Sequence, residues 1–238
     1  MNALFIGKRV LLQLIHDYWF LLFSILAPII IIINLEVFFS TFPNQFPVKD
    51  YIIGISALLV FTITFVLSMI SVVEERINGT LQRMFINGVS KSTIIIGYIL
   101  GYFVIATIQA FLVIILTIQL FDLDLSNESI AILFSTFWLL ALTSVALGVL
   151  ISSFVRRQVQ IIPFIPLVIV ISLFLSGIIV DVNDLPDAGR IIGQTTPLYY
   201  TNNIIQELNM GSWELMDILP NYLALIGIFT AIVFLSSL

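Results

Sequence analysis

The chain has 238 residues, of which 60% are hydrophobic and only 10% are charged, and its formal net charge is −5. This composition excludes a soluble globular domain, because too few polar side chains remain to cover a surface in water. Cysteine is absent, which excludes disulfides, thiolate metal sites and cysteine nucleophiles, and the acidic balance gives no sign of a nucleic-acid partner.

Six long apolar runs divide the sequence. A bilayer core of roughly 30 Å is crossed by about 20 apolar residues in a helix. The runs are continuously apolar, whereas the strands of a membrane barrel alternate apolar and polar residues. We therefore predict an all-α polytopic membrane protein, a single membrane domain over 1–238 without a cleavable signal peptide, with six transmembrane helices at 19–39, 52–73, 93–121, 130–154, 159–180 and 218–238.

Residues 1–17 precede the first run and have an amphipathic pattern. One helical face would carry Leu4, Phe5, Leu11, Leu12 and Ile15, and the other Lys8, Arg9, Gln13 and Asp17. This pattern predicts an interfacial helix whose basic residues meet anionic lipid. The alternative is that the segment simply extends the first span.

The first run contains residues that are unusual within a membrane. Pro28 lies in the middle and removes a backbone donor, which predicts a kink. Asn34 and Glu36 are candidates for a cavity or a subunit seam, because carboxylates are costly in lipid and are commonly functional there. The alternative is that Glu36 lies near enough to the interface to reach water.

The stretch 74–92, between the second and third runs, is the most polar segment on its side of the membrane. A short helix is predicted over Thr80–Ile86, with Thr80 as its N-cap and Asn87-Gly88 as its end. Ser90 and Ser92 can cap the next helix. The short helix would present Leu81, Met84 and Phe85 on one side and Gln82 and Arg83 on the other. We interpret this elbow as a docking element, the alternative being a solvated loop.

The fifth run contains Pro163 and Pro166, which predict an irregular first half. The long segment 181–214 follows it, and its apolar residues have spacings suited to short helices. We predict re-entrant or interfacial helices at 188–193 and 198–208, with Tyr199, Tyr200 and Trp213 at the level of an aromatic belt.

Charge predicts the orientation. Seven of the nine basic residues lie on one side of the predicted spans: Lys8, Arg9, Arg76, Arg83, Lys91, Arg156 and Arg157. The positive-inside rule then places both termini in the cytosol of a cell whose plasma membrane the chain spans, and the Arg156-Arg157 pair at lipid headgroups.

Several kinds of chemistry are missing from the sequence. It has no Gly-rich phosphate loop followed by Lys and Ser or Thr, so it does not bind ATP by that route. His16 is the only histidine, and no pair of aspartates lies within a span. We therefore expect no enzyme activity and an energy source outside the chain.

Several features, in this order, resemble the permease subunits of the ABC type-2 exporter family over essentially the whole chain. An amphipathic segment ends in His16-Asp17 before a span with a central proline. The elbow reads Glu74-Glu75-Arg76-Ile77-Asn78-Gly79-Thr80-Leu81-Gln82-Arg83 and continues to Val89-Ser90-Lys91, and the last part contains Ser176-Gly177, Leu185-Pro186 and Pro197-Leu198-Tyr199-Tyr200. One departure is the C-terminus, which ends at Ser237-Leu238 within the sixth run, whereas members often continue into a short basic tail.

The resemblance implies a mechanism and a set of partners. A bacterial permease of this kind pairs with a second copy or a paralogue and exports cargo with ATP and magnesium held on a separate ATP-binding cassette ATPase, binding no cofactor itself. Closure of the ATPase would push on the elbow and the N-terminal helix. The coupling residues would be Glu74, Glu75, Arg76, Gly79, Thr80, Leu81 and Arg83, and the outer re-entrant segment would include Gly177, Pro186, Pro197 and Tyr199.

The apolar spans favour a hydrophobic or amphipathic cargo, such as an antibiotic, a drug or a lipid-like molecule. A second hypothesis is a membrane scaffold or immunity protein that recruits a cytosolic partner through 74–92 and transports nothing. A membrane-embedded enzyme is a third hypothesis, which the missing catalytic clusters disfavour.

Overall fold

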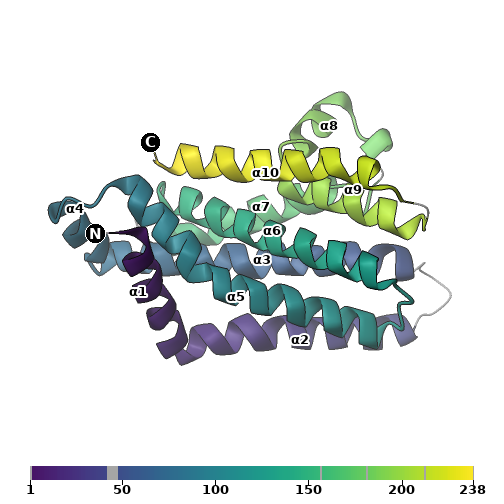
Figure 1. Cartoon of the computed structure of the whole chain (residues 1–238), viewed down its shortest axis with the longest axis horizontal. Coiled ribbons are helices and arrows are strands. Elements are labelled where there is room, and N and C mark those ends of the chain that lie inside the picture. The colour runs from purple at the N-terminus through teal and green to yellow at the C-terminus, as the bar shows by residue number, and fades with distance from the viewer. Residues whose placement is uncertain (1, 42–47, 156, 181, 212, 238) are drawn as a thin grey trace.

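The chain is an all-α polytopic membrane protein (Figure 1). The computed structural model describes residues 2–41, 48–155, 157–180, 182–211 and 213–237, and within them every regular element is a helix. In chain order the helices are α1 (Ala3–His16), α2 (Tyr18–Thr41), α3 (Val48–Ile77), α4 (Thr80–Ile86), α5 (Lys91–Leu120), α6 (Asn127–Ser152), η1 (Gln158–Gln160), α7 (Ile161–Leu175), η2 (Val182–Asp184), α8 (Asp187–Gly193), α9 (Pro197–Asn209) and α10 (Leu215–Ser237).

Six of these helices are long and apolar enough to cross a membrane: α2, α3, α5, α6, α10 and, together with η1, α7. Five of the predicted spans agree with the observed helices to within about one turn. The fifth is shorter than predicted, because α7 ends at Leu175 rather than near 180. The chain turns at Gly177, whose φ of 84° is available to glycine but strained for other residues.

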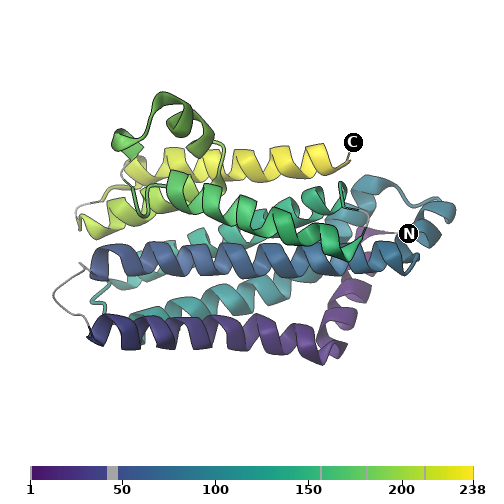
Figure 2. The same cartoon turned by 180° about the vertical axis from the view of Figure 1, so that it is seen from behind.

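The six helices run side by side along the long axis of the molecule, with α3, α5 and α6 between α2 and α10 (Figures 1 and 2). The most apolar part of α3 is 67% buried, against 11% for α7 and for α10. Small residues allow the central helices to approach closely: a Cβ added at Gly148 of α6 would lie 2.8 Å from the Phe65 carbonyl oxygen of α3. The outer helices expose their apolar faces, as expected for surfaces in lipid.

Polar side chains pair across the interior helices. The hydroxyls of Ser56 and Thr117 lie 2.8 Å apart, and the Thr64 hydroxyl donates to the Gln109 side-chain oxygen at 2.9 Å. These bonds join α3 to α5 at two depths. They fix the register of the two helices, since a shift would leave buried polar groups without partners.

Tyr222 joins α10 to α6. Its hydroxyl lies 2.6 Å from the Ser135 hydroxyl and 2.5 Å from the Thr136 hydroxyl, and it donates to the Ile132 carbonyl oxygen at 2.8 Å. Because most of α10 is exposed, this cluster is a main polar attachment of that helix to the bundle.

We expect Tyr222→Phe to lower the free energy of unfolding by about 1 kcal/mol, since interhelical hydrogen bonds in membranes contribute this much or somewhat less. Thermal unfolding in detergent would measure the change. Tyr18→Phe is the matched control, because Tyr18 is 82% exposed and loses no buried contact. Equal melting temperatures for the two variants would contradict the expectation.

The segment before α10 contains the two helices that the sequence predicts. They are α8 and α9, and their bounds differ from the predicted 188–193 and 198–208 by about one residue at an end. Pro186 precedes α8, and Pro197 is the first residue of α9, where its missing N–H costs nothing. Leu198, Ile204 and Ile205 are buried in the main apolar core, so α9 is an integral part of the bundle.

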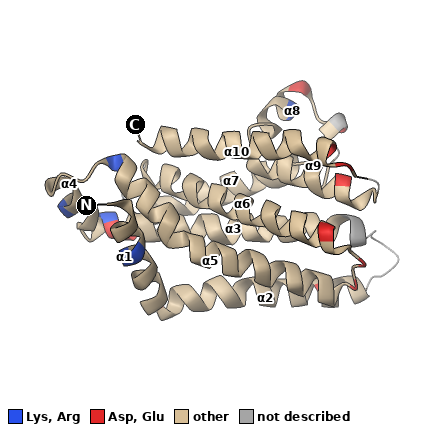
Figure 3. Ribbon diagram, viewed as in Figure 1, with Lys and Arg blue, Asp and Glu red and all other residues tan. Residues whose placement is uncertain are grey.

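Charges separate to the two ends of the bundle (Figure 3). We call the end that carries α1 and α4 the basic end; its described Lys and Arg residues are Lys8, Arg9, Arg76, Arg83, Lys91 and Arg157. The opposite, acidic end carries α8 and most of the carboxylates. Arg156 lies outside the described residues.

Candidate functional site

The elbow leaves the end of α3 by a glycine turn. Gly79 has a φ of 74° and is the N-cap of α4, which has the bounds of the short helix that the sequence predicts. Thr80 is the first helical residue and not the N-cap, so its side chain does not make the predicted capping hydrogen bond. The helix instead begins after the left-handed turn at Gly79. Gly88, with a φ of 75°, turns the chain again after α4. Both turns use a conformation that costs other residues about 1–2 kcal/mol.

The start of α5 is capped as predicted by Ser90, whose hydroxyl accepts a hydrogen bond from the Thr93 backbone N–H at 3.3 Å. Ser92 lies within the first turn of α5. The two turns and this cap hold α4 at the extreme basic end of the molecule, beyond the ends of α3 and α5 (Figure 1).

α4 has one buried and one exposed face. Leu81 and Met84 are buried against the basic-end core cluster, which includes Ile94 and Tyr98. Phe85 is 46% exposed and Ile86 is 85% exposed, together with the polar Gln82 and Arg83. Of the predicted apolar face, Leu81 and Met84 are therefore buried, whereas Phe85 is not, because α4 projects beyond the helices that would cover it.

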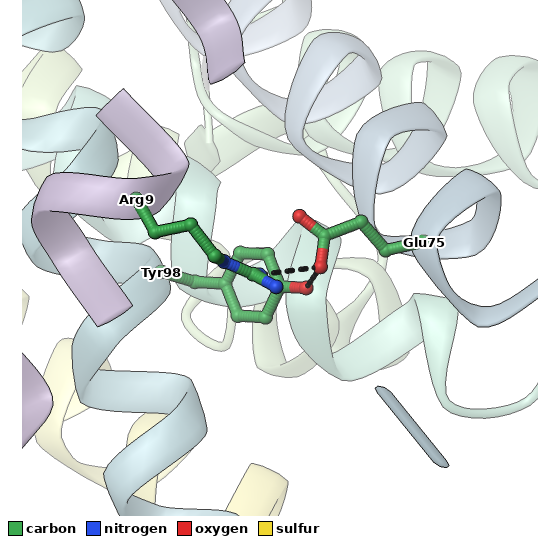
Figure 4. A network of polar contacts seen from close by, with 3 residues as sticks. All are labelled: Arg9, Glu75 and Tyr98. Atoms are coloured by element: carbon green, nitrogen blue, oxygen red, sulfur yellow. Dashed lines mark hydrogen bonds and ion pairs between the residues drawn. The ribbon is translucent and has the colours of Figure 1, made fainter. Parts of the chain in front are cut away.

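A buried ion pair joins the elbow to α1 and α5 (Figure 4). The Arg9 Nη2 atom lies 2.6 Å from Glu75 Oε2, and the Tyr98 hydroxyl donates to the same oxygen at 2.5 Å. The Glu75 side chain is 3% exposed, whereas Arg9 is 34% exposed. Three segments that are far apart in the sequence therefore meet at one carboxylate oxygen.

This geometry corrects two expectations from the sequence. Glu75, predicted as a coupling residue, is not exposed to a partner, because it is buried and its charge is balanced within the chain by Arg9. Arg9 does not extend toward lipid headgroups, because it turns inward to the end of α3 (Figure 4). Burial explains both, since a carboxylate that is removed from water requires a close cation.

Arg76, the next residue, reaches the opposite side. Its Nη1 atom donates to the carbonyl oxygens of Ser153 and Val155, at 3.1 Å each. These carbonyls follow the end of α6, where no helical donor is available for them. Arg76 thus attaches the end of α3 to the end of α6 and is half-buried rather than part of an open surface.

α1 lies against α5 with its backbone in close contact. A Cβ added at Gly97 would be 2.5 Å from Ile6 Cγ2, and one at Gly101 would be 2.6 Å from Val10 Cγ1. Gly7 of α1 lies at the same helix crossing, where an added Cβ would be 2.9 Å from Leu100 Cβ. The Gly97-x-x-x-Gly101 spacing, a recognised signal for close helix packing, was available in the sequence.

The buried face of α1 differs from the apolar face predicted from the sequence. Ile6, Gly7, Val10 and Leu14 contact the protein. Leu4, Phe5, Leu12 and Ile15 are exposed by 72%, 67%, 46% and 43%. α1 therefore has two apolar faces, one on α5 and one open, and the open face is the predicted one.

The predicted coupling residues divide into two groups. Glu74 and Arg83 are exposed, and Gly79 and Thr80 are partly exposed. Glu75 and Leu81 are buried and Arg76 is half-buried, so these three hold the elbow in position.

The other predicted residues lie away from the basic end. The Asn34 side chain donates to the Ile30 carbonyl oxygen of its own helix at 2.7 Å, and Glu36 is partly exposed on the same helix. Gly177 forms the turn after α7, and Tyr199 packs edge to face on Tyr200 with ring centroids 5.0 Å apart. Within the described residues, no three His, Asp or Glu side chains gather as a metal site.

Comparisons with known proteins agree with the sequence pattern. The family described as ABC-2 family transporter protein matches residues 44–238, which include the elbow. The linearmycin resistance permease protein LnrN of Bacillus subtilis (strain 168) is 28% identical over 149 residues, covering 63% of this chain and 38% of that protein. The probable multidrug ABC transporter permease YbhR of Escherichia coli (strain K12) is 25% identical over 166 residues, covering 70% of this chain and 45% of that protein.

A eukaryotic protein also matches. ABC transporter G family member 20 of Dictyostelium discoideum is 25% identical over 155 residues, which are 65% of this chain and 21% of that protein. In each of these three relatives the matched segment is less than half of the protein's length.

Proposed function

The chain belongs to the ABC-2 family of transporter proteins, and from that membership we propose that it is the permease subunit of an ATP-driven exporter. A separate ATP-binding cassette ATPase would supply the energy, with ATP and magnesium bound on that subunit. The basic end would face the cytosol, because six Lys and Arg residues of the described ranges lie there. The observation that carries the proposal is the elbow, which projects at the basic end and is anchored to α1, α5 and the end of α6.

The exposed part of the elbow has the composition of a docking surface. Ile77 and Ile86 are apolar and exposed by 51% and 85%, and Glu74 and Arg83 are charged and exposed beside them. An apolar tip between charges of both signs suits a partner surface, where the apolar contact supplies affinity and the charges supply orientation. A connecting loop would not need exposed isoleucines.

The buried part of the elbow would transmit the movement of the partner. Glu75 joins the end of α3 to α1 through Arg9 and to α5 through Tyr98, and Arg76 joins it to the end of α6. A push on α4 would therefore move α1, α3, α5 and α6 together and not bend the elbow alone. Buried charge pairs suit this role, because separating them is costly.

We propose a second permease copy or a paralogue as the other membrane partner. The most apolar parts of α2 and α7 are only 22% and 11% buried, so both helices have free apolar faces. A cavity between two such subunits would take a hydrophobic or amphipathic cargo. Two relatives, whose names refer to linearmycin resistance and to multidrug transport, support an antibiotic or drug-like cargo.

We expect Ile86→Asp to reduce binding of the ATPase by at least tenfold, since it places a charge at the centre of the apolar tip. The permease would be co-expressed with an ATP-binding cassette subunit from its own organism, and the ratio of the two proteins would be measured after purification. Ile191→Asp is the control, because Ile191 is 65% exposed and lies in α8 at the acidic end. Equal recovery of the ATPase with both variants would contradict the proposed docking surface.

Transport itself requires a second measurement. Cells that produce the permease and the ATPase are expected to tolerate more of the cargo antibiotic than cells with an inactive ATPase. If the ATPase binds but neither resistance nor efflux of an amphipathic dye changes, the chain recruits a partner without transport.

A further inference from the structure

A cavity of about 590 Å³ opens at the basic end, beside the elbow. The ends of α3, α4, α6 and α10 and the start of α5 surround it. Its polar wall includes Arg76, Lys91, Gln82 and Ser236, and its apolar wall includes Leu81 and Leu235. The cavity therefore has the mixed lining of a site for an amphipathic molecule.

Arg76 and Lys91 bring positive charge to this cavity. Two cations line it, and no carboxylate is among the described residues that form its wall. Within the part of the chain that the structure describes, the hydrogen bonds of the Arg76 guanidinium go to carbonyl oxygens, which are neutral. Glu75, its neighbour in the sequence, is paired with Arg9 of α1. An anion is the complementary ligand, because the carbonyl partners of Arg76 are neutral and an anion would balance the charge of its guanidinium.

An apolar groove continues from the cavity along the membrane helices. It has a volume of about 270 Å³, lies between α5 and α10, and includes Ile96, Phe229 and Val233. Ile95 belongs to the walls of both hollows, so they are adjacent. A small soluble anion would leave this apolar groove empty, whereas an acyl chain would fill it and bury apolar surface.

We propose that the cavity binds an anionic phospholipid, with its phosphate between Arg76 and Lys91 and one acyl chain in the groove between α5 and α10. The site lies where the membrane helices end, which is the level of lipid headgroups. The bound lipid links the end of α10 to the elbow. This link matters because α10 buries little of its own surface against the other helices.

The test uses the purified permease alone, so its outcome does not depend on the ATPase or on transport. The protein would be reconstituted in nanodiscs with equal amounts of phosphatidylglycerol and phosphatidylcholine, and retained lipids would be counted by native mass spectrometry. We expect phosphatidylglycerol to be retained in preference to phosphatidylcholine. Removing one cation, as in Lys91→Gln, is expected to weaken retention about fivefold.

The double variant Arg76→Gln/Lys91→Gln is compared with Lys8→Gln/Arg83→Gln, which loses the same charge at the same end but outside the cavity. Only the first double variant is expected to lose the lipid. Because Arg76 also holds the end of α6, Val233→Trp provides a second test that fills the groove and leaves both cations in place. This variant is also expected to lose the lipid.

Three results would overturn the proposal. Equal retention of phosphatidylglycerol by the two double variants would show that the cavity cations do not bind it. Displacement of the lipid by millimolar inorganic phosphate would identify a simple anion site. Equal retention of phosphatidylglycerol and phosphatidylcholine by the unmodified permease would show that the cavity does not select an anionic lipid.

Discussion

Arg9→Met is expected to lower the free energy of unfolding by about 3–5 kcal/mol, because it leaves the Glu75 carboxylate buried without its cation. Methionine keeps the apolar stem of the side chain, so the loss comes from the charge and not from packing. Thermal and denaturant unfolding in detergent would measure it. Lys8→Met is the control, since Lys8 is the adjacent exposed cation of α1 and its loss changes no buried pair.

The double variant Arg9→Met/Glu75→Gln tests whether the loss of stability comes from the unpaired carboxylate and not from other contacts of Arg9. Glutamine has no charge to balance, and its side-chain oxygen can still accept the hydrogen bond from Tyr98. We therefore expect the double variant to regain most of the stability that Arg9→Met loses, as a large coupling energy in a double-mutant cycle. If Arg9→Met is no less stable than Lys8→Met, the ion pair does not hold α1 to the elbow.

Gly97→Ala is expected to displace α1 from α5 and to destabilise the protein by about 1–3 kcal/mol. The added Cβ would lie 2.5 Å from Ile6 Cγ2 and 2.6 Å from Ile6 Cβ, which is far inside van der Waals contact. Ile6 cannot rotate its own Cβ away, so the helix must move. The ion pair of Arg9 would then be strained as well, since it lies on the same helix.

Gly227→Ala is the matched control for this prediction. Gly227 also lies within a helix, α10, but an added Cβ there would meet nothing within 4 Å. Because the chain has no cysteine, spin labels at cysteines introduced at Gln13 and Ile96 would report the separation of α1 and α5 directly. An unchanged separation in Gly97→Ala would contradict the close packing of these helices.

The helices and the bounds of the short helix in the elbow could be predicted from the sequence because their causes are local. Continuous apolar runs of about 20 residues predict membrane helices wherever they occur. Asn78-Gly79 and Asn87-Gly88 bound α4, since glycine adopts the left-handed conformation that each turn requires. The fifth span was predicted too long because residues 178–180 are as apolar as the rest of the run. The helix ends before them, since the chain turns at Gly177.

The roles of the two neighbouring carboxylates could not be predicted in this way. Glu74 and Glu75 are adjacent and equally acidic, and the sequence assigns both to the docking surface. In the structure Glu74 is exposed and Glu75 is buried beside Arg9 and Tyr98. The difference arises because successive helical residues point about 100° apart, and only one of them meets α1 and α5.

The sequence by itself therefore determined the class of the protein, its six membrane helices, the short helix of the elbow and the uneven distribution of charge, because each follows from composition or from neighbouring residues. Only the tertiary structure decided that Arg9 turns inward, that Glu75 and Arg76 anchor the elbow to three helices, and that Arg76 and Lys91 share a cavity with α10. These contacts join residues as many as 79 positions apart. Their pairing depends on how the helices pack, and the pattern of a single segment carries no information about the partner that will face it.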